Sequence, residues 1–100
     1  MKVASRTTAL RKQYEHSVKA KKAYGRLVAR KYIERVNILK AAKNQAEIMA
    51  QTALRCHALK GDRKGQYALL LHGRWRLIVT FHSGEIEIVR IEEVSKHYGD

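Results

Sequence analysis

Cations and a histidine gather in one stretch of the chain, residues 56 to 81, CHALKGDRKGQYALLLHGRWRLIVTF. Its loop, Lys60-Gly61-Asp62-Arg63-Lys64-Gly65, carries three cations, and its two glycines let the backbone turn sharply. The loop lacks the Gly-Lys-Ser/Thr ending of a Walker phosphate loop. His57 precedes it by three residues and is of the type that gains and loses protons near neutral pH. These residues together suggest phosphate binding combined with acid–base chemistry.

Two arginines follow in a segment that alternates with the period of a β-strand. On one face of residues 74–81 we expect Arg74 and Arg76, and on the other an apolar row of Trp75, Leu77, Val79 and Phe81. If helices cover the apolar row, the cations converge on a phosphodiester, whose oxygens match guanidinium forks. The converging cations would be Arg63, Lys64, Arg74 and Arg76. Tyr67, beside the loop, would stack a base.

Each of these residues also has a purely structural interpretation. The basic loop is then a solvated turn, and His57 is a packed histidine among leucines. His97 and Tyr98 reach the same groove if the last strand lies beside the hairpin, and otherwise belong to a frayed terminus. Cys56 is more typical of a passive, partly buried thiol than of a nucleophile. No histidine, cysteine and carboxylate cluster has the spacing of metal ligands, so we expect no metal.

The length and charge of the chain limit the classes of protein to which it can belong. The 100 residues suit a single domain, and the hydrophobic fraction of 45% predicts that it folds. The net charge of +12 indicates a polyanionic partner, either nucleic acid or an anionic membrane surface. Much of this charge lies in residues 1–43, which hold 13 cations and only two acids. No apolar run has the length of a signal peptide or a membrane span, and a lone cysteine fits a reducing compartment. We therefore expect a cytoplasmic protein that does not bind membranes.

The first half of the chain is predicted to be helical. Leu10, Tyr14 and Val18 form one stripe on a short helix, which Thr7 or Thr8 caps. A longer helix is expected over about residues 20–42. Its apolar face would comprise Tyr24, Leu27, Val28, Tyr32, Val36 and Leu39. A short third helix over residues 47–50, capped by Asn44, and a small edge strand within residues 1–5 complete this half.

The second half is predicted to form strands. We expect them over residues 54–59, 66–72, 74–81 and 85–94, with a tight turn at His72-Gly73. The alternation of the last strand slips at Ile88-Val89, which indicates either a bulge or a stretch buried on both sides. Helices followed by an antiparallel meander predict an α+β fold with the helices on one face of the sheet.

In these segments the sequence resembles a known family, the HigB toxins of the RelE/ParE superfamily. The likeness lies in HALKGDRKGQY (residues 57–67), GRWRL (residues 73–77) and the closing RIEEV (residues 90–94). It implies a RelE-like fold, with two N-terminal helices packed on a twisted antiparallel sheet. It also implies an mRNA interferase that cuts messages in the ribosomal A site without a metal, through attack by the substrate 2′-hydroxyl.

The resemblance implies roles for single residues. His57 matches a general acid or base, Lys60 a cation that assists at the phosphate, and Arg76 a group that stabilises the transition state. The family's terminal Asp-Tyr-His aligns with Lys96-His97-Tyr98, which implies that Lys96 contacts the RNA and that His97 and Tyr98 take part in catalysis. In a shorter alignment, the family's acid aligns with Glu93 instead. A cognate helix-turn-helix antitoxin of the HigA kind is the implied protein partner.

Two other functions remain open from the sequence. A ParE-like relative would poison DNA gyrase without cutting RNA. A noncatalytic basic module would bind RNA or the ribosome through the helix cations alone, with strong salt dependence.

Overall fold

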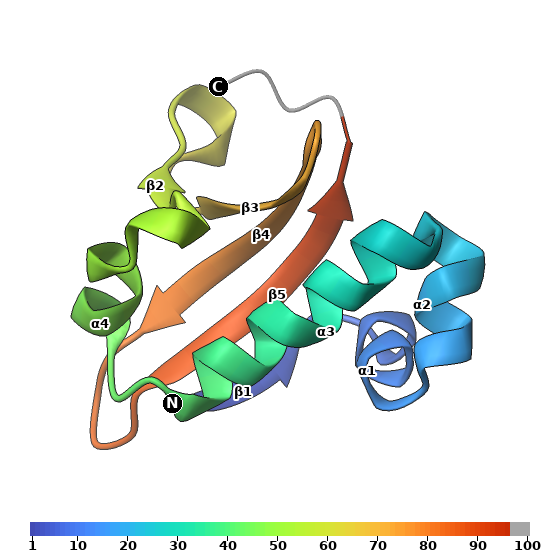
Figure 1. The fold of residues 1–100 in the computed structure, drawn as a ribbon. Coiled ribbons are helices and arrows are strands. Elements are labelled where there is room, and N and C mark those ends of the chain that lie inside the picture. Colours follow the sequence, from blue (N-terminus) through green and yellow to red (C-terminus); the bar gives the residue numbers. More distant parts are fainter. Residues whose placement is uncertain (97–100) are drawn as a thin grey trace.

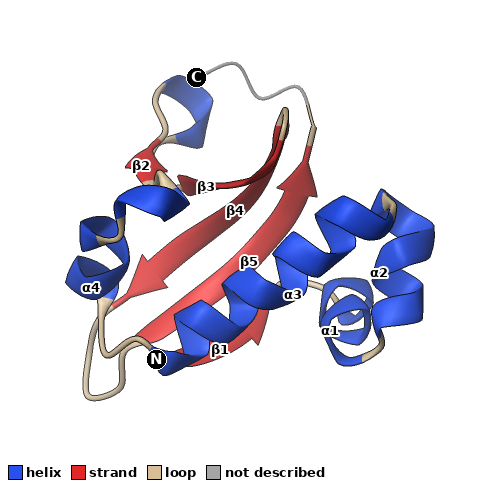
Figure 2. Ribbon diagram, in the orientation of Figure 1, coloured by secondary structure: helices blue, strands red, loops and turns tan. Residues whose placement is uncertain are grey.

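The structure, a computed structural model, describes residues 1–96 and contains a five-stranded sheet with helices on one face (Figure 1, Figure 2). The strand order is β1-β5-β4-β3-β2. The strands are β1 (Lys2–Ser5), β2 (His57–Ala58), β3 (Tyr67–His72), β4 (Trp75–His82) and β5 (Ile88–Ser95). The α-helices are α1 (Thr8–Glu15), α2 (Ser17–Tyr24), α3 (Arg26–Ala41) and α4 (Gln45–Ala50). The α+β class expected from the sequence is therefore confirmed.

Local sequence signals begin two of the helices. Thr7 caps α1, its hydroxyl oxygen accepting the Leu10 amide at 3.1 Å. Asn44 caps α4 in the same way, accepting the amide of Glu47 at 3.1 Å. Both caps were predicted, although α4 begins two residues earlier than expected. None of the helices in residues 1–96 combines the length and apolar composition that crossing a membrane would require.

The predicted helix over residues 20–42 is wrong at its start. Gly25 adopts φ 83°, a left-handed conformation that ends α2, and α3 begins at the next residue. The predicted stripe of the first helix is also broken, at His16 between α1 and α2, where the backbone is extended with φ -128°. Each break changes the phase of the helical face. Val18 and Leu27, both predicted to pack, are consequently 62% and 46% exposed.

The core lies between α3 and the sheet. The buried face of α3 includes Val28, Tyr32, Val36 and Leu39, which recur at helical spacing. They belong to one buried cluster with apolar side chains of three strands: Leu69, Leu71, Leu77, Val79, Val89 and Ile91. Arg35 is also buried, and its Nε donates to the carbonyl of Leu70 at 3.1 Å, which satisfies the charged group inside the protein. Figure 1 shows α3 lying across the sheet, with α1 and α2 beside it.

The sheet is mixed rather than wholly antiparallel. β1 runs parallel to β5, with Lys2 opposite Ile88 and Ser5 opposite Ile91, whereas the other strand pairs are antiparallel. The expected edge strand is present, but a four-residue strand carries no local signal of its direction. The strand predicted over residues 54–59 is shortened to His57–Ala58, because Thr52–Leu54 forms a 3-10 turn.

A bulge in β5 sets which side chains reach each face of the sheet. Ile78 lies opposite Glu93, and the next residue of β4, Val79, lies opposite Ile91, so that Glu92 is the extra residue. The bulge predicted at Ile88-Val89 is therefore misplaced. Both of those residues pair regularly with β4.

The buried phenol of Tyr32 provides a test of the α1–α3 packing. Its hydroxyl donates to the carbonyl of Leu10 at 2.8 Å, and the side chain is fully buried. Tyr32→Phe should lower the free energy of unfolding by about 1–2 kcal/mol, because the carbonyl loses a buried donor. Urea unfolding measures the change, with Tyr67→Phe as the control because the Tyr67 ring is only partly buried. Equal unfolding midpoints in the two variants would contradict the proposed contribution of this bond.

Candidate active site

The sheet has a second face, opposite α3, which we call the polar face. It carries His57, Arg76, Thr80 and Glu93, since these alternate with the core residues of their strands. The predicted division of β4 is thus confirmed: Leu77 and Val79 point into the core, and Arg76 points away from it. This arrangement leaves the cations and His57 outside the apolar layer.

A single row crosses the polar face from β2 to β5. His57 lies opposite Ala68, Ala68 opposite Ile78, and Ile78 opposite Glu93. Adjacent strands are about 4.8 Å apart, so the backbones of His57 and Glu93 are separated by roughly 14 Å. Ala68 and Ile78 are fully buried between them and form an apolar floor.

The ring of His57 is oriented by the backbone before it. Its Nδ1 lies 2.9 Å from the carbonyl oxygen of Arg55, which can only accept, so Nδ1 carries the proton and Nε2 is the basic nitrogen of the neutral ring. Arg55 itself has φ 49°, a left-handed conformation that costs a non-glycine residue about 1 kcal/mol. The backbone is thus strained two residues before the histidine.

Arg63 reaches across the polar face from the loop to β5. It donates through Nη1 to the carboxylate of Glu93 and to Oε1 of Gln66, the latter at 3.1 Å. Both members of the ion pair are 35% exposed. Through Arg63, the pair therefore anchors the basic loop over the polar face, at the row that runs from His57 to Glu93.

Arg76 belongs to the next row of the same face. It lies opposite Leu70 on one side and Ser95 on the other, about 7 Å along β4 from Ile78. Its Nη1 donates to the carbonyls of Gly73, at 2.7 Å, and Trp75, at 3.1 Å. These bonds hold the guanidinium against the turn between β3 and β4.

The other cations of the loop and hairpin lie at the exposed rim. Lys60 and Lys64 flank the 3-10 turn Gly61–Arg63, and both are exposed. The two loop glycines adopt φ 62° and 94°, so the predicted sharp turns are confirmed. Arg74 is exposed in the two-residue turn before β4, which is Gly73-Arg74 rather than the predicted His72-Gly73.

Two predicted RNA contacts lie elsewhere. Tyr67 pairs with Val79, on the core side of the sheet, and its ring packs edge-on against Phe81 with centroids 5.2 Å apart. The ammonium of Lys96 lies 5.7 Å from the ring centroid of Trp75, on the same side as α3. The structure therefore does not bring either residue to Arg76 or His57. His97 and Tyr98 lie outside the described residues.

A second ionic cluster centres on Glu92. Arg90 contacts its carboxylate with Nε at 2.7 Å and Nη2 at 3.1 Å, and the hydroxyl of Thr80 donates to it at 2.7 Å. Because of these bonds, Arg90 first among them, the pKa of Glu92 lies below its usual value even though burial opposes the shift. The oxygen of Thr80 also lies 3.0 Å from Nε2 of His82, which extends the cluster along β4.

Neither the thiol nor a metal site offers alternative chemistry within residues 1–96. Burial raises the pKa of Cys56 to about 11, so little nucleophilic thiolate forms at neutral pH. No three side chains among His, Cys, Asp and Glu gather in a way that could hold a metal ion in this part of the chain. Acid–base and cationic groups are the chemistry that the polar face presents.

The sequence did not reveal that Arg63 contacts both Glu93 and Gln66. The contact of Arg63 with Glu93 joins residues 30 apart, and Gln66 joins the same contact. The run Glu92-Glu93 was a signal, because regular alternation would send one of two adjacent acids into the core. Finding the bulge that prevents this would have identified the pair.

The Arg63–Glu93 pair predicts a measurable coupling. In a double-mutant cycle of Arg63→Gln and Glu93→Gln, we expect a coupling energy of about 1 kcal/mol in the free energy of unfolding, reduced by salt because the pair is partly exposed. Arg11 and Glu15, an exposed pair at 3.0 Å on α1, form the control cycle, with about 0.3 kcal/mol expected. A coupling no larger than in the control would show that the pair does not anchor the loop.

The Glu92 cluster predicts a pH dependence of stability. The pKa of Glu92 is lower in the folded state than in the unfolded state. The contribution of Glu92 to the free energy of unfolding is therefore full above the unfolded-state pKa of about 4.3, and it is lost as pH falls through the folded-state pKa. Glu92→Gln should therefore cost about 1–2 kcal/mol at pH 7. The difference from the unsubstituted protein should shrink below about pH 4. Urea unfolding over a pH series tests this, with the exposed Glu85→Gln as the control; a difference independent of pH would refute it.

Comparison with known proteins places the fold. No protein-family model matches the sequence significantly, and no curated protein does. Among solved structures, a YoeB/ParE toxin from Agrobacterium tumefaciens matches with a TM-score of 0.68 and 16% identity, covering 98% of this chain and 100% of that one. YafQ from E. coli strain BL21(DE3) matches with a TM-score of 0.59 and 13% identity, covering 95% of this chain and 91% of its own.

A third structure, the YoeB–YefM complex from Staphylococcus aureus, matches with a TM-score of 0.56 and 17% identity over 98% of both chains. At these identities the likeness establishes the backbone arrangement and not the chemistry. The chain thus has the α+β fold of the YoeB and YafQ toxins, with its helices on one face of the sheet and its candidate site on the other.

Proposed function

We propose that this protein is the toxin of a type II toxin–antitoxin pair and acts as an mRNA endoribonuclease. The observation that carries the proposal is the row on the polar face, where His57 and Glu93 share one face of the sheet and Arg63 reaches Glu93 from the basic loop. Arg76 lies in the neighbouring row. A base, an acid and cations are the groups that cleavage of a phosphodiester requires.

The proposed reaction uses the nucleophile within the RNA. A base removes the proton of the ribose 2′-hydroxyl, and the oxygen attacks the adjacent phosphorus. The bond from phosphorus to the 5′-oxygen breaks, and an acid returns a proton to that oxygen. The products are a 2′,3′-cyclic phosphate and a free 5′-hydroxyl, and the proposed steps need no metal.

The local geometry supports a division of roles. Nε2 of His57 is the basic nitrogen of the neutral ring and serves as the acid–base group. Glu93 is the candidate for the acidic position, as in the shorter alignment, and it also holds Arg63 in place. Arg76 balances the negative charge that gathers on the phosphate in the transition state.

The exposed cations at the rim would bind the RNA on either side of the reacting phosphate. Lys60, Lys64 and Arg74 are all exposed, so they can meet backbone oxygens. We propose that the message is bound in the ribosomal A site, following the resemblance to HigB. That resemblance rests on the loop and hairpin motifs, whereas the structural neighbours carry the names YoeB, ParE and YafQ.

An antitoxin is the protein partner we propose. A YoeB–YefM complex shows that a protein with this backbone arrangement assembles with a second chain. For this chain we propose a helix-turn-helix antitoxin of the HigA kind, which the sequence resemblance implies.

Gyrase poisoning is the second candidate, because the name of one structural neighbour includes ParE. In that case growth stops with intact messages, and purified DNA gyrase loses supercoiling activity when the protein is added. The residues of the polar face would then be dispensable for toxicity.

Induced expression in a bacterium tests the primary proposal. Sequencing of RNA 5′ ends shortly after induction should reveal new ends inside translated reading frames. His57→Ala and Arg76→Ala should each reduce these ends by about 100-fold, the usual scale for losing an acid–base or charge-stabilising group.

Lys12→Ala, at an exposed position of α1, is the matched control and should cut like the unsubstituted protein. Circular dichroism of the purified variants checks that they fold. If folded His57→Ala still produced the same ends, the proposed site would be wrong.

A further inference from the structure

The backbone at Arg55 departs from what its residue type prefers. Arg55 has φ 49° and ψ 41°, and within residues 1–96 it is the one residue other than glycine with a positive φ. This left-handed conformation crowds the Cβ atom, so glycine or asparagine suits it and arginine does not. Such a conflict between residue and backbone persists where the surrounding structure imposes it, and it is expected at functional sites.

Fixed points on both sides of Arg55 impose this conformation. On one side a 3-10 turn ends, with the Arg55 amide donating to the carbonyl of Thr52 at 3.1 Å. Leu54, which is only 2% exposed, anchors that turn in the buried core cluster. On the other side His57 pairs with β3 in the sheet. Only two residues separate Leu54 from His57, so the chain turns sharply at Arg55 to pass from the core to the sheet edge.

The turn at Arg55 aims its carbonyl group at the ring of His57. The carbonyl oxygen lies 2.9 Å from Nδ1 of this histidine, which is two residues further along the chain. An extended residue would instead point its carbonyl sideways, in the direction of a neighbouring strand. The contact therefore depends on the left-handed backbone of Arg55 and not on its side chain, which is exposed.

This carbonyl decides which nitrogen of the neutral His57 ring carries the proton. A neutral imidazole has one N–H donor and one acceptor nitrogen, and in an isolated histidine side chain the proton prefers Nε2. The Arg55 carbonyl can only accept, so it favours the proton on Nδ1 and leaves the lone pair on Nε2. The opposite tautomer would present a proton at Nε2, where a base needs a lone pair.

We propose that Arg55 is a positioning residue, whose left-handed backbone holds the proton of the neutral His57 ring on Nδ1 and the basic lone pair on Nε2. Residues that tolerate a left-handed backbone keep this tautomer at position 55, whereas β-branched residues lose it. The part that Arg55 plays in catalysis rests on the proposed function, in which His57 is the acid–base group. The tautomer itself belongs to the free protein and is measured without RNA.

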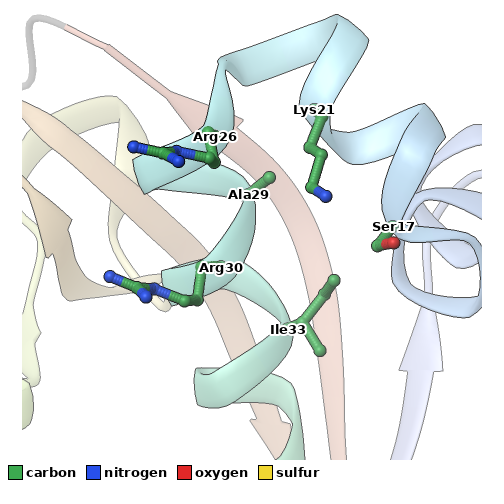
Figure 3. Close-up of a pocket in the computed structure, with 6 residues that line it drawn as sticks. All are labelled: Ser17, Lys21, Arg26, Ala29, Arg30 and Ile33. Carbon is green, nitrogen blue, oxygen red and sulfur yellow. The ribbon is translucent and has the colours of Figure 1, made fainter.

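Three substitutions at position 55 separate the backbone from the side chain. Arg55→Gly, Arg55→Asn and Arg55→Val remove the same charge, but only valine strongly disfavours the left-handed conformation. Arg30→Val is the control, because it makes the same change at an exposed position of α3, where the side chain projects from the helix (Figure 3). Circular dichroism and urea unfolding establish whether each variant folds.

Long-range ¹H–¹⁵N correlation spectra of the histidine rings identify the tautomer at about pH 8.5, where imidazoles are ordinarily neutral. The chain has five histidines, so the signals of His57 are assigned by their absence from His57→Ala. We expect the proton on Nδ1 in the unsubstituted protein, Arg55→Gly, Arg55→Asn and Arg30→Val. In Arg55→Val the proton should shift to Nε2.

Two results would overturn the positioning role. One is a folded Arg55→Val that keeps the proton on Nδ1, and the other is loss of that proton in Arg55→Gly or Arg55→Asn, since the side chain would then set the tautomer. If Arg55→Val does not fold, the other two variants still decide, because retention of the Nδ1 proton in both supports the role.

RNA cleavage provides a second comparison among the variants of position 55. Arg55→Val should produce new 5′ ends about tenfold more slowly than Arg55→Gly and Arg55→Asn, because its acid–base group is in the wrong tautomer. Equal cleavage despite a shifted tautomer would overturn the role of Arg55 in catalysis. If the unsubstituted protein cuts no RNA, the proposed ribonuclease function fails, and the spectra still decide whether Arg55 sets the tautomer.

Discussion

The extra residue in β5 is the constraint on which the candidate site depends. With regular alternation after Ile91, Glu93 would point beneath α3 and Val94 would face the polar side. The bulge at Glu92 turns both adjacent acids to the polar face, where each meets an arginine: Glu92 binds Arg90, and Glu93 binds Arg63. An unpaired carboxylate in the apolar layer would cost several kcal/mol, so the bulge both protects the core and builds the site.

Signals contained within a few residues were predictable from the sequence. The Thr7 and Asn44 caps, the alternation of residues 74–81 and the turns at the loop glycines all depend on neighbouring residues alone. The predictions that were wrong concern features that depend on backbone conformation or on contacts with distant parts of the chain. The periodicity runs through Gly25 although the backbone there ends a helix, and the direction of β1 depends on a partner at the other end of the chain. Tyr67 was expected to stack a base beside the loop, whereas its register with Val79, which is not visible locally, places it on the core side of the sheet.

The arginines of the polar face are held in place by other groups of the protein. On the polar face the arginines are held by carboxylates and carbonyls, as Arg63 is by Glu93 and Arg76 by Gly73, so their positions are fixed before any substrate binds. Charge that the protein fixes in this way before binding can stabilise a transition state without reorganisation.

Cleavage of a labelled message on purified ribosomes, with EDTA present, tests whether the polar face cleaves RNA. We expect cuts in the A-site codon that leave a cyclic phosphate and a 5′-hydroxyl, and no cut where the message carries a 2′-deoxy sugar at that position. Two results would contradict the assignment of the polar face as an RNA-cleaving site. One is cleavage that persists at the 2′-deoxy position, and the other is a message that remains intact when folded protein and mRNA-programmed ribosomes are both present.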